Sequence, residues 1–514
     1  MSKTIIIIGA GLAGLSAALQ AAENGCNVKL VSSLPSERAQ SVMAEGGINA
    51  ALNTKDENDS PEEHFTDTIK AACGLADPNA VWGMTQAAPE LVHWLLKFGV
   101  QFNMSGYDDV DLRNFGGQKK KRTAFAQSDT GKQIMTAMID AVRRKEASGM
   151  VEQFSHHSFL TLRLCGNICC GCVIRDEYSQ ETVELPGDAV IVATGGMHGL
   201  FGNTTGSLSN TGEVTAELFR LGVPLANGEM IQYHPTTVKC GGKRMLISEA
   251  ARGEGGRLFA MKDGKQWYFM EEKYPELGNL MPRDITAREI WKVSHESEVF
   301  LDMTEISEEI ISNKLSGLAD DCMTYLHKDI RKEPVSVLPG IHYFMGGILV
   351  DEQHRTPVQN LYAAGECCAQ YHGANRLGGN SLLGALYGGR VAAKSACEQA
   401  DVVDLSCATQ IDFPPASQIS EIKQLNKVMQ ETMGVVRNEN TLLNGIQTVQ
   451  ALTGNLPLLG MAVLKSALAR KESRGAHWRE DYPKSNDNDY LKTTVARFDG
   501  KQIQISFVPV PERR

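Results

Sequence analysis

The sequence predicts an α/β fold built on a parallel sheet whose strands come from distant parts of the chain. An apolar strand from Thr4 to Gly9 leads directly into a glycine-rich turn and an alanine-rich helix. Similar apolar strands end in glycine near residues 195 and 365. The stretch between them, from about 228 to 340, lacks repeated strand–helix alternation, which predicts an insertion into a discontinuous domain.

The first 33 residues form a βαβ pattern. A helix is expected from Leu12 to Asn24 and a second strand from Asn27 to Ser32. The turn between them carries the spacing GxGxxG, with glycines at Gly9, Gly11 and Gly14. In this spacing the first glycine makes the tight turn, the second lets a pyrophosphate approach, and the third lets the helix pack on the sheet. The pattern predicts a Rossmann-like dinucleotide site, with a purely structural turn as the alternative.

The end of the second strand departs from the usual dinucleotide pattern. NAD-binding chains carry Asp or Glu there for the ribose hydroxyl. This chain has Ser32 and Ser33, and Glu37 comes only later. A serine can still hydrogen-bond a ribose, so Ser32 is a cofactor candidate, but the NAD interpretation loses support.

A later loop combines glycines, asparagines and one arginine. It runs from His372 to Leu383, after the strand at 361–366 and before a helix rich in small residues. Helix N-termini and free backbone N–H groups carry partial positive charge, so this loop suits an anion or an electron-rich ring. The sequence therefore predicts a binding loop around Arg376.

The C-terminal part is predicted to be helical, with helices at 419–433, 437–453 and 461–472 and a β-like tail at 494–498 and 502–508. The predicted division is a dinucleotide-binding domain at 1–227 and 341–405, an α+β capping domain at 228–340, and a C-terminal helical domain at 406–514.

Composition excludes several classes of function. The 514 residues carry a net charge of −10 without a basic patch, which argues against nucleic acid. The twelve cysteines lack the paired spacing of zinc or iron–sulfur sites, which predicts no metal and reduced core thiols. No apolar run reaches the roughly 18 residues that a membrane helix needs. Together these features predict a cytoplasmic protein.

Twelve motifs, in order, make the chain similar to a known family over nearly its whole length: the flavoprotein subunits of succinate dehydrogenase and fumarate reductase, to which L-aspartate oxidase also belongs. The motifs are GAGLAG (9–14), AEGGINAAL (44–52), FGGQ (115–118), ATGG (193–196), NTGE (210–213), QYHPT (232–236), SEAARGEGG (248–256), PRD (282–284), HYFMGG (342–347), GEC (365–367), HGANRLGGNSLL (372–383) and RKESRGAHWREDYP (470–483).

The resemblance implies FAD, bound by the discontinuous Rossmann-like domain. It implies that the three glycines of the first turn face the pyrophosphate, that Glu213 lies near the adenosine and that Glu366 meets the ribityl chain. Ser381 and Leu382 are expected to present backbone N–H groups to the electron-rich N1/O2 edge of the flavin. The remaining cofactor positions that it implies are Ala44, Gly46, Gly47, Ala193, Thr194 and Gly195.

The resemblance also implies a clamp for the two carboxylates of a four-carbon diacid. Its members are His234, Ser248, His342 and Arg376. Taken alone, each histidine fits a satisfied core group better, and only the motifs favour binding. A dianion in a closed site needs paired, hydrogen-bonded charge, and a guanidinium can grip a carboxylate with two parallel bonds.

Fumarate reduction needs a hydride from flavin N5 on one carbon and a proton on the other. Arg283 resembles the proton donor of the family, and Glu249 and Arg252 resemble the relay that reloads it. The alternative is that Arg283 only adds positive charge beside the substrate. Arginine is a poor acid in water, because its pKa lies above about 12.

Two positions distinguish branches of the family. Aspartate oxidases carry glutamate where this chain has Phe115, and a phenyl ring cannot neutralise an ammonium group. A plain dicarboxylate is therefore favoured, with L-aspartate oxidase, which makes iminoaspartate, as the alternative. Gln40 stands where a histidine holds FAD covalently in membrane-bound relatives, so non-covalent FAD is expected. In this family the covalent link assists succinate oxidation, so the absence of the link favours fumarate reduction.

The resemblance implies an electron-transport partner. The helical C-terminal region of such flavoproteins lies beside an iron–sulfur subunit, so we expect such a partner, and through it a quinone or soluble donor and a peripheral place at the inner face of the membrane. A free-standing enzyme is the alternative. A flavin-carrying subunit without turnover would lack clamp residues, yet all of them are present.

Overall fold

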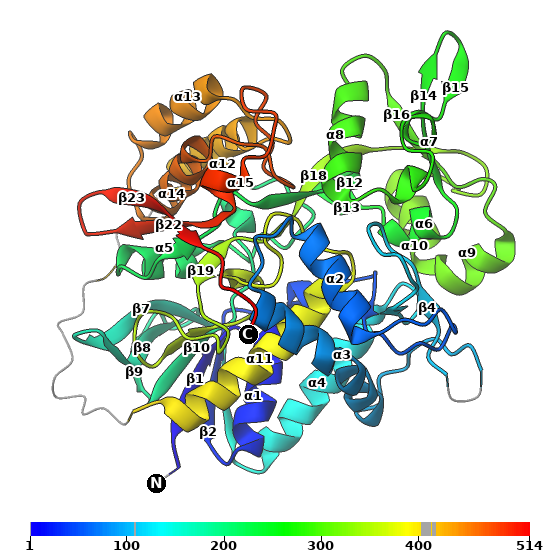
Figure 1. The fold of residues 1–514 in the computed structure, drawn as a ribbon. Coiled ribbons are helices and arrows are strands. Elements are labelled where there is room, and N and C mark those ends of the chain that lie inside the picture. Colours follow the sequence, from blue (N-terminus) through cyan, green and yellow to red (C-terminus); the bar gives the residue numbers. More distant parts are fainter. Residues whose placement is uncertain (1, 107–108, 402–412, 414–417) are drawn as a thin grey trace.

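The computed structural model describes residues 2–106, 109–401, 413 and 418–514. Its central sheet contains five parallel strands in the order β20-β10-β1-β2-β6 (Figure 1). They are β1 (Thr4–Ile8), β2 (Asn27–Ser32), β6 (Val151–Ser155), β10 (Ala189–Val192) and β20 (Leu361–Ala363). Most neighbouring strands thus come from distant parts of the chain, and the α/β fold class is confirmed.

Both faces of this sheet are covered, which explains the four consecutive isoleucines of β1. Ile5 and Ile7 pack in the same core as the helices, and Ile6 and Ile8 pack in the core of an antiparallel meander. The helices are α1 (Leu12–Glu23), α3 (Pro78–Lys97), α4 (Thr130–Ala147) and α11 (Asn380–Gln399). Helix α2 (Pro61–Ala71) packs on α3 in a smaller core of its own. The meander contains β7 (His157–Cys165), β8 (Ile168–Asp176) and β9 (Thr182–Pro186).

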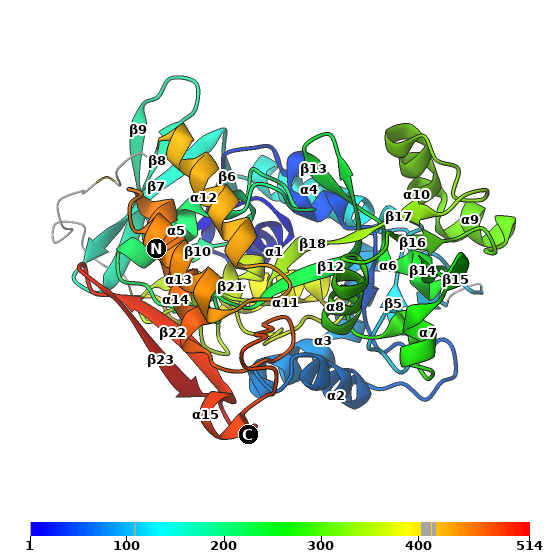
Figure 2. The ribbon, with the colours of Figure 1, turned by 90° about the horizontal axis from the view of Figure 1, so that it is seen from above.

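The predicted insertion forms a separate lobe, at the upper right of Figure 1 and on the right of Figure 2. Two small antiparallel sheets and several helices surround their own apolar core. The sheets contain β12 (Ile231–Cys240), β13 (Lys243–Leu246) and β18 (Leu338–Phe344), and β14 (Arg257–Lys262), β15 (Lys265–Trp267), β16 (Val299–Asp302) and β17 (Val335–Ser336). The helices are α6 (Glu249–Gly253), α7 (Phe269–Lys273), α8 (Arg283–Val293), α9 (Glu308–Lys314) and α10 (Ser316–Asp321).

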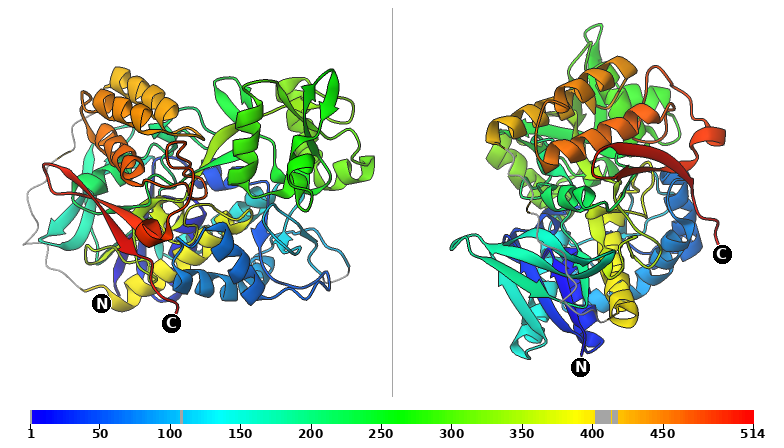
Figure 3. Two further views of the ribbon diagram at one scale, coloured as in Figure 1. Left: turned by 45° about the horizontal axis from the view of Figure 1, so that its top comes forward. Right: turned by 90° about the vertical axis from the view of Figure 1, so that its left-hand side faces the viewer.

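The C-terminal region contains α12 (Ile419–Thr432), α13 (Glu439–Val449) and α14 (Asn455–Ala469), which pack near α5 (Glu213–Arg220) and lie above the parallel sheet in the right-hand view of Figure 3. The third helix begins and ends earlier than predicted. Pro457 is tolerated because it lies in the first turn. The predicted domain boundary at 405–406 lies outside the described residues.

The residues after α14 leave the helix because their charges are buried in ion pairs. Arg470 bonds Glu229 and Glu472, each at 2.7 Å, and all three side chains are fully buried. The following hairpin, β22 (Lys492–Phe498) and β23 (Ile503–Pro509), completes a second sheet. Its other strands are β11 (Leu225–Ala226), β19 (Gly347–Leu349) and β21 (Cys368–Ala369).

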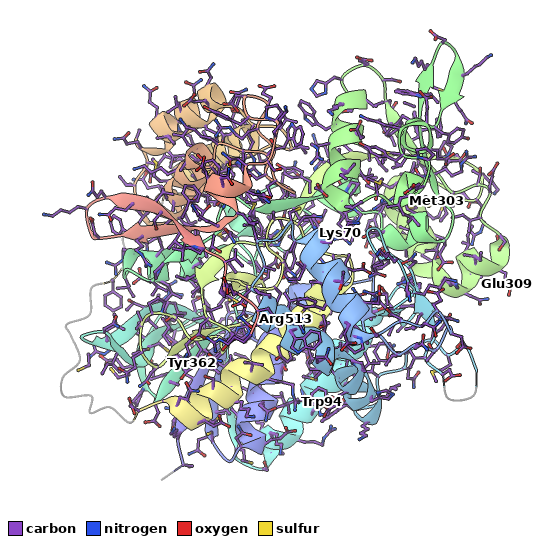
Figure 4. All side chains as sticks on the ribbon, in the orientation of Figure 1. Lys70, Trp94, Met303, Glu309, Tyr362 and Arg513 are labelled. Carbon is purple, nitrogen blue, oxygen red and sulfur yellow. The ribbon has the colours of Figure 1, made fainter. Side chains whose placement is uncertain are left out.

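Beyond the hairpin the chain returns to helices α2 and α3. The guanidinium carbon of Arg513 lies 3.9 Å from the ring centre of Trp82 and 4.8 Å from that of Phe65. Figure 4 marks Arg513 near the centre of the molecule, in front of α11. The C-terminal segment thus connects the second sheet to the helical layer of the first.

Short strands complete the description: β3 (Ile48–Asn49), β4 (Leu112–Arg113) and β5 (Thr123–Ala124). Within the described ranges, no helix combines the length and apolarity that membrane crossing requires. Ten of the cysteines in the described part of the chain are free thiols. The expectation of reduced core thiols is wrong for Cys165, which is disulfide-bonded and lies only partly buried at the end of β7.

Candidate active site

One cavity of about 1400 Å³ runs from the β1–α1 turn to the inserted lobe. Every predicted site residue lines it except Gly14 and Arg252. The lining residues include Gly9, Gly11, Ser32, Ala44, Gly46, Gly47, Phe115, Ala193, Thr194, Gly195, Glu213, His234, Ser248, Glu249, Arg283, His342, Glu366, Arg376, Ser381 and Leu382. The fold therefore gathers these residues from most of the chain into one space.

The three glycines of the first turn have different environments. A Cβ on Gly9 would lie 2.3 Å from the Ala193 carbonyl oxygen, and a Cβ on Gly14 only 1.8 Å from that of Gly9. A Cβ on Gly11 would meet nothing closer than 3.6 Å. Gly9 and Gly14 are thus required by backbone packing, while Gly11 opens onto the cavity, where a phosphate could approach.

The N-termini of two helices, α1 and α11, face the cavity. Neither helix has an N-cap side chain that bonds its first turn. In α1 the Leu12 N–H donates to Ser41 Oγ (3.2 Å), and the N–H groups that follow it remain for a ligand, as do those of Ser381 and Leu382 in α11. At α11, Asn380 is held by Asn49 (2.7 Å) and His64 (2.9 Å), which fixes the turn that carries Ser381 and Leu382. This donor set fits FAD, since one helix can face a pyrophosphate and the other an electron-rich flavin edge.

Two glutamates lie along the same cavity. Glu366 accepts a hydrogen bond from the Phe344 backbone N–H (3.0 Å) and lies 3.6 Å from His198. Glu213 begins α5, and burial raises the pKa of its carboxyl. Both are suitably placed to accept hydrogen bonds from ligand hydroxyls.

Arg376 is buried and has no anionic partner within the described residues. Its side chain is engaged only by the ring of Tyr343, whose centre lies 4.3 Å from the guanidinium carbon, and its Nε has no hydrogen-bond acceptor. Burial and the nearby charge of Arg283 lower the pKa of Arg376 to about 9. An unpaired buried guanidinium in a cavity is a binding site for an anion.

Two histidines lie beside this charge. The ring centres of His234 and His342 are 5.1 Å apart, and His342 Nδ1 lies 2.8 Å from Thr205 Oγ1. Burial holds the pKa of each ring well below its usual value. Repulsion from Arg283 lowers both pKa values further, and repulsion from His234 also lowers the pKa of His342. Neutral imidazoles can donate a hydrogen bond to a carboxylate near neutral pH. Ser248 lies in the same wall, at the N-cap of α6.

The other two arginines share one carboxylate. Arg283 Nε donates to Glu249 Oε2 (2.8 Å), and Arg252 Nη2 donates to Glu249 Oε1 (3.2 Å). Burial raises the pKa of Glu249, but the two guanidinium groups outweigh it and lower it to about 2. Arg252 therefore lies behind Glu249 rather than in the cavity. The three side chains form the continuous row that a proton relay requires.

Phe115 separates the two ends of the cavity. Its ring would lie about 3.0 Å from a Cβ on either Gly46 or Gly378, so it packs against both glycine loops. The neighbouring Gly116 N–H donates to Glu249 (3.1 Å). No carboxylate stands at the Phe115 position to receive an ammonium group.

Sequence reasoning missed several residues of the site. Gln232 accepts from Arg283 Nη1 (3.0 Å) and donates to the Arg376 carbonyl (2.8 Å). It lies two residues before His234, hence on the same face of β12, and this spacing could have identified it. Tyr343 and Thr205 carried no comparable signal, because only long-range packing brings them here.

Glu45 is a further unpredicted residue of the cavity. Its Oε2 is buried without a partner, although Arg113 donates to the neighbouring backbone carbonyls. Burial, and then repulsion from Asp321, raise the pKa of Glu45 to about 8. The carboxyl is therefore protonated at neutral pH.

Comparisons with known proteins agree with this geometry. A family model described as an FAD binding domain matches residues 4–382, and one described as the fumarate reductase flavoprotein C-term matches residues 452–513. The succinate dehydrogenase flavoprotein subunit of Bacillus subtilis is 37% identical, over all of this chain and 98% of its own. The 8-methylmenaquinol:fumarate reductase flavoprotein subunit of Wolinella succinogenes is 32% identical, over all of this chain and 92% of its own.

Solved structures show the same relationship. A mutated quinol fumarate reductase chain from Escherichia coli superposes with a TM-score of 0.90 at 27% identity, covering 99% of this chain and 97% of its own. Sdh1 of Mycobacterium smegmatis, solved in complex with UQ1, gives 0.84 at 29% identity, covering all of this chain and 95% of its own.

Glu45 makes the stability of the chain depend on pH. In the unfolded chain its carboxyl ionises near pH 4.5, whereas in the folded chain it keeps its proton to about pH 8. The free energy of unfolding therefore falls as pH rises between these values. Thermal denaturation of wild type and Glu45→Gln should show a melting-temperature advantage for the variant that grows from about pH 5 to about pH 8. A melting-temperature difference that does not change with pH would contradict the raised pKa of Glu45. The control is Glu431→Gln, at an exposed position.

Proposed function

The chain belongs to the succinate dehydrogenase/fumarate reductase flavoprotein family, and from this premise we propose that it binds FAD and interconverts fumarate and succinate. The observation that carries the proposal is the buried guanidinium of Arg376, which faces the cavity and has no anionic partner in the part of the chain that the structure describes. A substrate carboxylate would supply that partner. FAD, when bound, would supply the two-electron chemistry by giving or taking a hydride.

Charge balance favours a plain dicarboxylate. The cluster contains the guanidinium groups of Arg252, Arg283 and Arg376 and the carboxylate of Glu249, so it carries a net charge of +2. A dicarboxylate dianion neutralises this charge while the histidines stay neutral. L-aspartate would leave one positive charge unbalanced and would place its ammonium group near Phe115, which cannot accept a hydrogen bond. These arguments favour fumarate and succinate over oxidation of L-aspartate to iminoaspartate.

In this proposal each residue of the clamp has one task. Arg376 grips one carboxylate, and His234, His342 and Ser248 donate hydrogen bonds to the substrate. Arg283 gives a proton to the substrate carbon, and Glu249 returns one to it along the row from Arg252. Glu249 is ionised at any working pH, since its pKa lies near 2, so it can accept a proton from that row. The buried walls exclude competing water.

We propose further that the chain exchanges electrons with an iron–sulfur protein and reaches a membrane only through such partners, at its inner face. The names of its relatives support this, because they are flavoprotein subunits of larger enzymes. The cytoplasmic location and the three-domain division remain parts of the same proposal.

Steady-state assays of the FAD-loaded chain test the substrate. Reduced-dye oxidation should be fast with fumarate, dye reduction slower with succinate, and peroxide formation absent with L-aspartate, because Phe115 offers no acceptor to its ammonium group. Turnover of L-aspartate alone would show that the interpretation of Phe115 is wrong.

Arg283→Ala should keep FAD and lose turnover. Proton donation by a placed side chain contributes roughly 10²–10⁴-fold, and kcat for fumarate should fall by that range. FAD absorbance should be unchanged, because Arg283 lies at the substrate end. Lys292→Ala, at an exposed position on the same helix, is the matched control. Near-normal kcat in Arg283→Ala would assign proton donation elsewhere.

We expect FAD to be held non-covalently, since the amide of Gln40 lacks the nucleophilic ring nitrogen that forms the link. Gln40 lines the cavity and accepts a hydrogen bond from the Ser207 backbone N–H (2.5 Å). Acid precipitation should therefore release flavin fluorescence into the supernatant. Fluorescence that stays with the pellet would contradict the expectation.

A further inference from the structure

A short turn of the C-terminal region lies against the loop that carries Arg376. This turn, Arg474–Trp478, is called the 474–478 turn below. The Ala476 N–H donates to the Ala374 carbonyl (2.9 Å). Gly475 has φ +55°, and a Cβ there would lie 2.6 Å from the same carbonyl oxygen. The turn is therefore in direct contact with the backbone two residues before Arg376.

The same turn also holds helix α8, whose first residue is Arg283. Arg288, one and a half turns along α8, donates to the Gly475 carbonyl (3.2 Å). Its guanidinium carbon lies 4.3 Å from the ring centre of Trp478. A cation over an aromatic face is attracted by the ring, so this contact fixes α8 to the turn.

The contacts close into a ring. Arg288 Nη1 lies 3.3 Å from Asp284 Oδ2, and Asn375 Nδ2 donates to Asp284 Oδ1 (3.1 Å). Asn375 follows Ala374, which returns the ring to the 474–478 turn. Gln232 crosses the ring, because it binds both Asn375 and Arg283. In a closed ring, movement of one member strains the others.

We propose that the 474–478 turn, acting through Arg288, sets the separation between Arg283 and Arg376, and that Arg288 is a positioning residue of the reaction proposed above. The proposal rests on that function, since Arg283 and Arg376 are the two groups that must meet opposite parts of one substrate. A misplacement of about 1 Å between such groups can cost up to about 10²-fold in rate.

A double-mutant cycle tests the proposal on the full, FAD-loaded chain. Arg288→Ala and Trp478→Leu should each lower kcat/KM for fumarate by roughly 10- to 10²-fold, with FAD content and melting temperature close to wild type. A raised KM would indicate that Arg376, which binds the substrate, is displaced. A lowered kcat would indicate that Arg283, which donates the proton, is displaced. The double variant should be no worse than the worse single variant, because both break the same contact. Additive losses, or an unchanged kcat/KM in Arg288→Ala, would overturn the proposal.

Conservative variants separate positioning from folding. Arg288→Lys keeps the charge beside Asp284 and should recover part of the lost kcat/KM, while Lys292→Ala on the same helix should match wild type. If Arg288→Ala does not retain FAD, Arg288→Lys and Trp478→Phe form the cycle under the same criteria. A wild-type chain that binds FAD but does not turn over fumarate would refute the proposed function itself. Wild-type turnover with unaffected variants would refute only the positioning role.

Discussion

The structure depends on a positive charge that the protein leaves unbalanced. Arg376 is buried against Tyr343 and has no carboxylate partner among the described residues. An isolated buried charge is costly, so its loop must be held from outside, by Gln232 and by the turn at 474–478. Burial, together with repulsion from Arg283, holds the pKa of His234 and His342 well below the usual value, and Arg376 adds to this at His342 only. The cavity is thus electrostatically incomplete until a dianion enters it.

Three arginines in one site behave differently because their partners differ. Arg252 and Arg283 share Glu249, so their charge is largely compensated, and the row of three can pass a proton without a net change of charge. Among the described residues Arg376 has no such partner, so its charge is available to an anion. Elsewhere in the cavity the N-termini of helices α1 and α11 offer partial charges only, which would suit the polar but less charged parts of a dinucleotide.

Local patterns predict the parts of the molecule that depend on local physics. The isoleucine run of β1 and the spacing of Gly9, Gly11 and Gly14 predict the first βαβ unit, because turn and packing there involve adjacent residues. The third C-terminal helix begins and ends earlier than predicted, because Pro457 is tolerated in its first turn and the buried ion pairs of Arg470 join segments that are distant in the sequence.

In the site, motifs identify most of the residues that line the cavity. The motifs do not reveal that Gly14 and Arg252 lie behind the cavity wall, because a motif does not show which of its residues face the cavity. Gln232 could have been found from its strand register. Thr205 and Glu45 could not, because their neighbours come from distant segments of the chain.

The hairpin β22–β23 bears on how the protein is made. Strand β22 pairs with β11, which is synthesised more than 250 residues earlier, and the turn at 474–478 supports the Arg376 loop. A nascent chain can form its first βαβ unit on the ribosome, but it cannot close the second sheet or steady that loop until residues beyond 490 have emerged. The loop that carries Arg376 is therefore steadied late in synthesis, long after the turn at Gly11 has been made.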